Sequence, residues 1–167
     1  MVNTAFELAA LGVPHGSPSY RGLRQAAMGT PVTRTLPPAT NSKDLPKDVQ
    51  RLLSKIRKHP SKASSSYYHN SYAQYFDDAS SSLRETMRVL KPGGLAVLIV
   101  QSSYYKEVCV DLPQLYLSLA SQHGLSGAIA GEMKIRRALA QINPHAAKYN
   151  RRPSYKEAVL LLEKGTR

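Results

Sequence analysis

The sequence predicts an α/β domain of three layers, in which helices cover both faces of a largely parallel sheet that ends on one antiparallel strand. Two observations lead to this fold class. Residues 95–100 (LAVLIV) are continuously apolar and largely β-branched, which is typical of a strand buried on both faces. Helix-period and strand-like segments alternate around this run, an order typical of parallel sheets. The last apolar segment, 157–163, follows a loop instead of a helix, and therefore predicts a hairpin-like return.

The length and charge of the chain set its domain organisation and its partners. It has 167 residues, 42% of them hydrophobic, which suits one modest core. We expect a single domain over 1–167, with loops and a basic helix over 1–71 and a helix–strand core over 72–167. The formal charge of +12 attracts polyanions such as nucleic acid. A ribosome-associated or merely soluble basic protein would carry the same charge.

The cysteine and histidine content argues against several kinds of site. A single cysteine, Cys109, cannot form an internal disulfide, which is typical of a reduced, cytoplasmic protein. The histidines are scattered without metal-ligand spacing, so we expect no metal. No apolar run approaches the ~20 residues that cross a bilayer, and the first residues do not resemble a secretory signal, so we expect no membrane contact.

The first half of the chain is mostly loop-like and holds one clear amphipathic helix. Residues 2–11 predict a short helix or an irregular lead-in. Residues 15–43 are too rich in proline, glycine and serine for an interior helix or strand, and predict a long loop. Residues 44–58 carry apolar side chains at helical spacing, which predicts a helix. Its outer face is basic, with Lys47, Arg51, Lys55, Arg57 and Lys58.

The second half predicts the helices and strands of the core. After a polar connector over 61–71, apolar side chains at helical spacing predict a helix from about residue 75 to the turn Lys91-Pro92-Gly93-Gly94. Proline cannot continue a helix and glycine permits a tight reversal into the strand at 95–100. Asp111 is a suitable N-cap for a helix that ends at Gly124, and a further strand follows over 125–130.

Several of these segments resemble one enzyme family. Residues 83–100 resemble the helix, KPGG turn and fifth strand of the class I methyltransferase (Rossmann-like) fold. The link after that strand and the end of the chain resemble the DNA amino-methyltransferases, in the segments 101–113, 134–137, 144–152 and 155–164. The resemblance covers about residues 72–164, the carboxy-terminal half of that fold.

Upstream, Gly16-Ser17-Pro18-Ser19-Tyr20 resembles the catalytic signature of the same enzymes, Ser or Asp followed by Pro-Pro and an aromatic residue. The resemblance implies that Ser17 accepts a hydrogen bond from the amine of an extruded base, that Pro18 shapes the turn and that Tyr20 stacks on the base. The second proline is Ser19 here, and the residues before the motif do not form an apolar strand. An ordinary proline-containing turn is the alternative.

The resemblance implies methyl transfer from S-adenosylmethionine to an exocyclic amine of cytosine (N4) or adenine (N6) in DNA, as in restriction-modification. No G-x-G motif for binding that cofactor occurs in the chain. Either a partner polypeptide supplies the cofactor-binding half, or the chain is a truncated or degenerate copy. The alternative function is a catalytically inactive nucleic-acid-binding remnant, stabilised by self-association or by a host complex. A fragment of an RNA or small-molecule methyltransferase is a third possibility.

Basic side chains near two loops are candidates for nucleic-acid contact. They are Arg21, Arg24, Arg136, Arg137, Lys148, Arg151 and Arg152, with Tyr149 among the later ones. Cations interleaved with an aromatic ring can follow phosphates and stack on a base, although a solvated loop has the same composition. The tyrosines at 67, 68, 72 and 75 are more often packing residues than a stacking platform.

Overall fold

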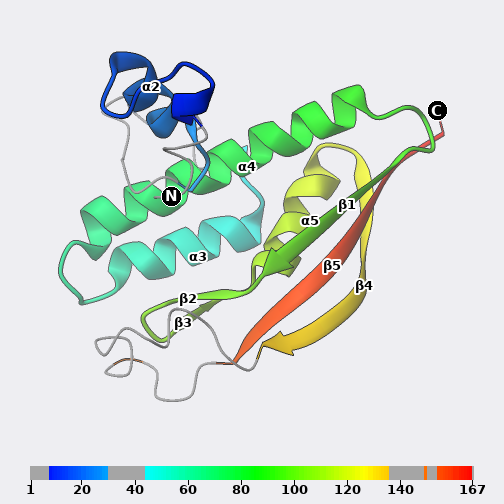
Figure 1. The fold of residues 1–167 in the computed structure, drawn as a ribbon. Coiled ribbons are helices and arrows are strands. Elements are labelled where there is room, and N and C mark those ends of the chain that lie inside the picture. The colour runs from blue at the N-terminus through cyan, green and yellow to red at the C-terminus, as the bar shows by residue number, and fades with distance from the viewer. Residues whose placement is uncertain (1–7, 30–43, 136–148, 150–153, 167) are drawn as a thin grey trace.

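The computed structural model describes residues 8–29, 44–135, 149 and 154–166 (Figure 1). The elements in chain order are α2 (Pro18–Ala26), α3 (Lys47–Lys58), the π-helix η2 (Ser64–Tyr68), α4 (His69–Val89), β1 (Leu95–Gln101), β2 (Ser103–Tyr105), β3 (Val108–Val110), α5 (Leu112–Gln122), β4 (Leu125–Ile135) and β5 (Tyr155–Lys164). None of the helices in these residues is both long and apolar enough to cross a membrane.

The sheet is antiparallel, so the prediction of a largely parallel sheet is wrong. Its order is β1-β5-β4, and β5 runs antiparallel to both neighbours, with Leu160 opposite Leu98 on one side and Ile129 on the other. The crossover through α5 does make β1 and β4 point the same way. However, the chain returns through β5 and inserts this last strand between them, so no two described strands of the sheet are parallel neighbours.

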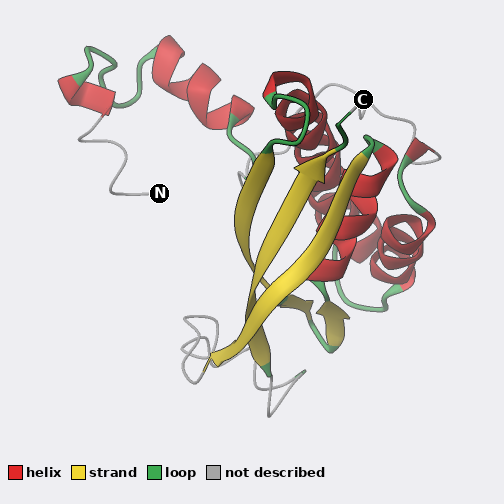
Figure 2. Cartoon of the chain, turned by 90° about the vertical axis from the view of Figure 1, so that its right-hand side faces the viewer, coloured by secondary structure: helices red, strands yellow, loops and turns green. Residues whose placement is uncertain are grey.

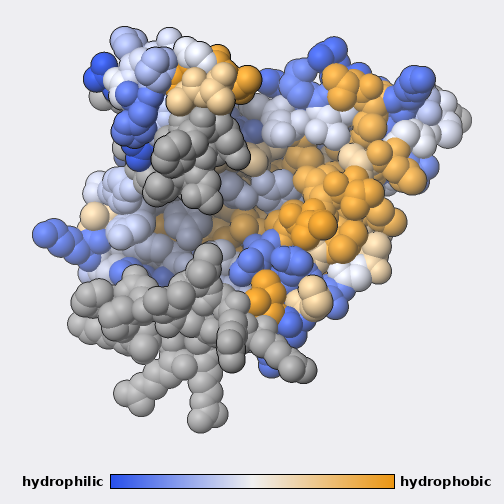
Figure 3. Space-filling model, viewed as in Figure 1, coloured by the Kyte–Doolittle hydropathy of each residue, from blue (hydrophilic) through white to orange (hydrophobic). Residues whose placement is uncertain are grey.

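The three-layer arrangement is also wrong, because no described helix covers the second face of the sheet, here called the open face (Figure 2). Helices α3, α4 and α5 all lie on the other face (Figure 2). Along β1 the side chains alternate, and those on the open face are exposed: Leu95 60%, Val97 61% and Ile99 69%. They form part of a hydrophobic area that is visible over the sheet in Figure 3. β1 is therefore an edge strand covered on one face, not a central strand covered on both.

The core lies between the helices and the inner face of the sheet. Helices α3, α4 and α5 each contribute one buried stripe, as their periodicity predicts. α4 buries Phe76 and Leu83, α5 buries Leu119, and β5 contributes Leu160 and Leu162 from the sheet. The bounds of α3, α5 and β1 agree with the predicted segments to within a few residues.

The turn between α4 and β1 forms as the KPGG sequence predicts. Leu90 leaves the helical conformation, and Gly93 has a φ of 72°, where a side chain would be strained. The N–H of Gly93 donates to the carbonyl of Lys164, and the N–H of Lys164 donates to the carbonyl of Gly94. These bonds fix the start of β1 against the end of β5.

Three segments differ from the sequence-based expectation. The loop predicted over 15–43 contains helix α2, which stands apart from the sheet in Figures 1 and 2. The connector over 61–71 is helical, because η2 leads directly into α4 at His69. The link over 101–113 contains the hairpin of β2 and β3, whose turn places Lys106 at a φ of 57°.

Candidate nucleic-acid interface

The motif at Ser17 forms the start of a helix. The Oγ of Ser17 accepts a hydrogen bond of 3.1 Å from the N–H of Tyr20, and Pro18 occupies the first turn of α2. This is the geometry of an N-cap followed by proline. The ring of Tyr20 is buried, with its centroid 4.7 Å from that of His15. The roles in base binding that the resemblance implies for these residues stay predictions.

The resemblance also implies that the Ser17 turn and the carboxyl end of the strand at 95–100, which is β1, border one pocket. Among the described residues, no hydrogen bond, ion pair or ring contact joins residues 15–20 to β1. A polar contact near this region runs instead from the Tyr116 hydroxyl, which donates to the sulfur of Met28 at 3.9 Å. The described residues therefore bring Ser17 and Tyr20 together with each other but not with β1.

The predicted nucleic-acid-binding residues fall into two groups. Arg21 and Arg24 are exposed on α2. Outside the described residues lie Arg136, Arg137, Lys148, Arg151 and Arg152. Tyr149 is described, and the ammonium group of Lys106 lies 4.2 Å from its ring centroid. A cation thus meets an aromatic ring beside the β2–β3 hairpin.

A continuous row of cations lies on the outer face of α3. It consists of Lys47, Arg51, Lys55 and Lys58, which we call the α3 cationic row, and all are exposed. Their spacing of three or four residues places them on one side of the helix. At 1.5 Å per residue the row extends about 16 Å, which matches about five nucleotides of a duplex strand. Sequence analysis found this basic face but did not assign it as a site.

Two features keep the row cationic. The acidic residue of α3, Asp48, faces inward, where its Oδ2 accepts a hydrogen bond of 2.6 Å from the Ser118 hydroxyl of α5. Three ion pairs form between described residues, and none of them involves the row. Within the described part of the chain, the row can therefore neutralise phosphates without first breaking an ion pair.

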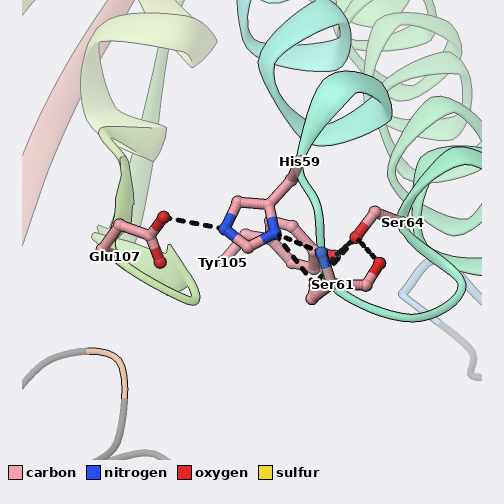
Figure 4. A network of polar contacts seen from close by, with 5 residues as sticks. All are labelled: His59, Ser61, Ser64, Tyr105 and Glu107. Atoms are coloured by element: carbon pink, nitrogen blue, oxygen red, sulfur yellow. Dashed lines mark hydrogen bonds and ion pairs between the residues drawn. The ribbon is translucent and has the colours of Figure 1, made fainter.

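A polar network anchors the turn that follows α3 (Figure 4). His59 Nδ1 accepts the N–H of Ser61 at 3.1 Å, so the ring proton lies on Nε2, which donates to Glu107 Oε1 at 2.7 Å. The Ser61 hydroxyl lies 2.9 Å from the same Nδ1 and 3.2 Å from the hydroxyl of Tyr105. Ser64, which is buried, joins the hydroxyls of Ser61 and Tyr105.

This network has the residue order of a Ser-His-Glu relay, but its geometry is that of an anchor. The Nδ1 lone pair that would act as a base already accepts a backbone N–H. The Ser61 hydroxyl is shared among three partners, two in the same turn and Tyr105 on β2. The network therefore holds the end of α3 and the start of η2 against the β2–β3 hairpin.

Tyrosine rings pack around this anchor. The ring centroid of Tyr68 lies 5.3 Å from that of Tyr105 and 5.2 Å from that of Tyr67. Burial, followed by the nearby Tyr105 and Tyr68 hydroxyls, raises the pKa of Tyr72 to about 12. Tyr67 differs from the others because it is 41% exposed. The tyrosine cluster is thus packed together, with Tyr67 at its surface.

The described residues show no arrangement that identifies a site for S-adenosylmethionine, the cofactor that the resemblance implies, and its binding stays a prediction. At the carboxyl end of β1, the N–H of Ser102 donates to the carbonyl of Lys156, and its Oγ accepts the N–H of Lys156. Both hydrogen bonds pair Ser102 with the last strand, and we derive no step through S-adenosylmethionine. No group of metal-ligating side chains occurs among the described residues either. The chain matches no protein-family model, no curated protein and no solved structure.

Proposed function

We propose that this protein binds nucleic acid, and that the α3 cationic row is the main contact to the phosphate backbone. The observation that carries the proposal is the row itself: exposed cations on one face of a well-packed helix, in a chain with a net charge of +12. Cations in this arrangement release counterions from a polyanion, which favours binding. The exposed Arg21 and Arg24 of α2 add to the positive charge of the surface.

The rigidity of α3 supports the proposal. Val49, Leu53 and Ile56 are buried on the inner side of the helix, and Asp48 is bonded to α5. The cations are therefore presented at fixed spacing, which lowers the entropy lost on binding. A row on a frayed or isolated helix would lack this advantage.

A salt series tests the proposal. Binding of labelled duplex DNA, structured RNA and single strands is measured by fluorescence anisotropy at several salt concentrations. The double variant Arg51→Gln/Lys55→Gln should bind all of them more weakly. Its plot of log affinity against log salt for duplex DNA should be shallower by about 2, because each phosphate contact contributes about 0.9 to the slope.

The matched control removes two cations that lie elsewhere. Lys91 and Lys134 are exposed, in the turn before β1 and on β4. The variant Lys91→Gln/Lys134→Gln lowers the net charge by the same amount and should leave the slope unchanged. Equal losses in both double variants would mean that only the overall charge attracts nucleic acid, and the assignment to α3 would be wrong.

A component of an amino-methyltransferase is the second candidate function, in which this chain supplies the half that faces the target base. The local order of α4, the KPGG turn, β1, α5 and a closing β5 favours it, since these are the segments that carry the resemblance. Calorimetry with S-adenosylmethionine tests it, on the isolated chain and on the chain mixed with the product of any neighbouring reading frame. Absence of heat in both cases would exclude methyl transfer. Under either proposal, we place the protein in the cytoplasm.

A further inference from the structure

The exposed ring of Tyr67 lies where the chain leaves the α3 cationic row. α3 ends at Lys58, the exposed Lys62 follows in the turn, and Tyr67 is on η2, which packs against α3. Tyr67 is 41% exposed, more than the tyrosines packed behind it. Cations that continue into an accessible aromatic ring form the combination with which proteins bind single strands, phosphates on the cations and a base on the ring.

The ring of Tyr67 is supported from behind. Tyr68 meets it edge-on, with centroids 5.2 Å apart and planes at 80°, and Tyr68 in turn contacts the buried Tyr105. The Lys106 ammonium lies 5.8 Å from the Tyr68 centroid. Because neighbouring rings hold Tyr67 in place, its side chain loses little conformational entropy when a ligand stacks on it.

The backbone under Tyr67 is also held in place. η2 is entered through Ala63 at a φ of 62° and is closed by a hydrogen bond of 3.0 Å from the Tyr68 N–H to the Ala63 carbonyl. A non-glycine residue in the left-handed region and a π-turn both cost free energy, and both occur often at functional sites. The network of His59, Ser61 and Glu107 described above stabilises this conformation.

We propose that the protein binds single-stranded nucleic acid by stacking one base on Tyr67 while the α3 cationic row holds the adjoining phosphates. The inference rests on the proposed function and narrows its substrate class. Bases in a duplex are stacked on one another inside the helix and cannot reach a ring at the protein surface without being extruded. Stacking on Tyr67 therefore favours single strands over duplexes.

The experiment compares substitutions at Tyr67 on two kinds of ligand. Probes are labelled oligo-dT and oligo-U of about 20 nucleotides and a duplex of equal length, a size within reach of one site. Tyr67→Ala should weaken binding of the single strands about 10-fold, within the range measured for loss of one stacked base, and leave duplex binding unchanged within about 2-fold. Tyr67→Phe should bind like the wild type. Tyr67→Leu, which is apolar but has no aromatic face, should behave like Tyr67→Ala.

The outcomes separate this inference from the proposed function. Wild-type binding by Tyr67→Ala, equal losses on single strands and duplex, or retention of binding by Tyr67→Leu would overturn stacking on Tyr67. If Arg51→Gln/Lys55→Gln still weakens binding in those cases, the nucleic-acid-binding proposal stands. If that double variant has no effect on any probe, both proposals fail. Tighter binding of oligo-U indicates RNA as the ligand, and tighter binding of oligo-dT indicates DNA. Thermal melting confirms that each variant is folded.

Discussion

The ammonium group of Lys164, near the end of β5, lies 2.8 Å from the carbonyl oxygen of Leu90, the residue that ends α4. The same group donates a second hydrogen bond of 2.8 Å to the carbonyl of Met87. It thus satisfies two of the carbonyls that a helix leaves unpaired at its carboxyl end, and places a positive charge at the negative end of the helix dipole.

Replacing this group should destabilise the protein. Lys164→Met keeps the aliphatic stem but leaves both carbonyls without their partner, and we expect a loss of about 1–2 kcal/mol in the free energy of unfolding. Denaturant unfolding followed by circular dichroism measures it. Lys134→Met, an exposed lysine on β4, is the control and should change stability by less than about 0.5 kcal/mol. Equal effects would mean that the contact to α4 contributes nothing.

The hydrogen bond between Asp48 and Ser118 should couple α3 to α5. Its length of 2.6 Å and its charged acceptor make it one of the stronger kind, so Ser118→Ala should cost about 1–2 kcal/mol. In a double-mutant cycle with Asp48→Ala, the coupling energy should exceed about 0.5 kcal/mol. Ser54→Ala, on the exposed side of α3, serves as the control. Additive losses in the cycle would show that the two side chains do not interact in solution.

Acid should weaken the anchor at the end of α3. A hydrogen bond from its own backbone N–H, and then the one from His59, hold the pKa of Glu107 below its usual range. A carboxyl with a lowered folded pKa stabilises the fold above its unfolded value of about 4.3, and that contribution is lost as the pH falls through the folded pKa. Glu107→Gln should therefore melt at a lower temperature than wild type at neutral pH.

The difference between Glu107→Gln and wild type should shrink as the pH is lowered below about 4. Thermal melts across that range measure it, with Glu163→Gln on β5 as the control. A gap that stays constant with pH would contradict a role for the ionised carboxylate.

Alkali should destabilise the protein through Tyr72. Because burial raises its pKa to about 12, the unfolded chain loses this proton first, at about pH 10. The stabilisation is complete below about pH 10 and is lost as the pH rises through about 12. Tyr72→Phe has no proton to lose, so its stability should fall less over that interval, by an amount on the order of 2 kcal/mol. Urea unfolding at a series of pH values checks this, and parallel curves for Tyr72→Phe and wild type would contradict it.

Elements with a strong period and a clear stop signal could be predicted from the sequence. The KPGG turn and the N-cap Asp111 fixed the start of β1 and α5, and both segments form where expected. The sequence did not predict α2, because proline usually argues against a helix. Pro18, however, occupies the first turn, where a missing N–H costs nothing. The serine-rich run before His69 has weak helix propensity, and tertiary contacts of Ser64 with Tyr105 decide its conformation.

The direction and coverage of the strands could not be predicted in the same way. The apolar run from Leu95 to Val100 has the same composition whether one face or both are covered, so its periodicity does not distinguish an edge strand from a central one. Strand order depends on long-range pairing, here of Leu98 with Leu160.

The candidate site was missed for a related reason. The basic side of α3 was visible in the sequence, but the inward orientation of Asp48 and the exposure of Tyr67 depend on packing against distant segments.

The edge of β1 that faces away from β5 pairs with no described strand, and this affects the handling of the isolated protein. From Leu95 to Gln101 the strand carries no proline and no charge, the two devices that usually discourage unwanted pairing along a sheet margin. Its backbone groups on that side are a template on which another extended segment can add. The purified protein should therefore aggregate through this edge above a certain concentration. Val97→Lys should raise that concentration, and light scattering measures it.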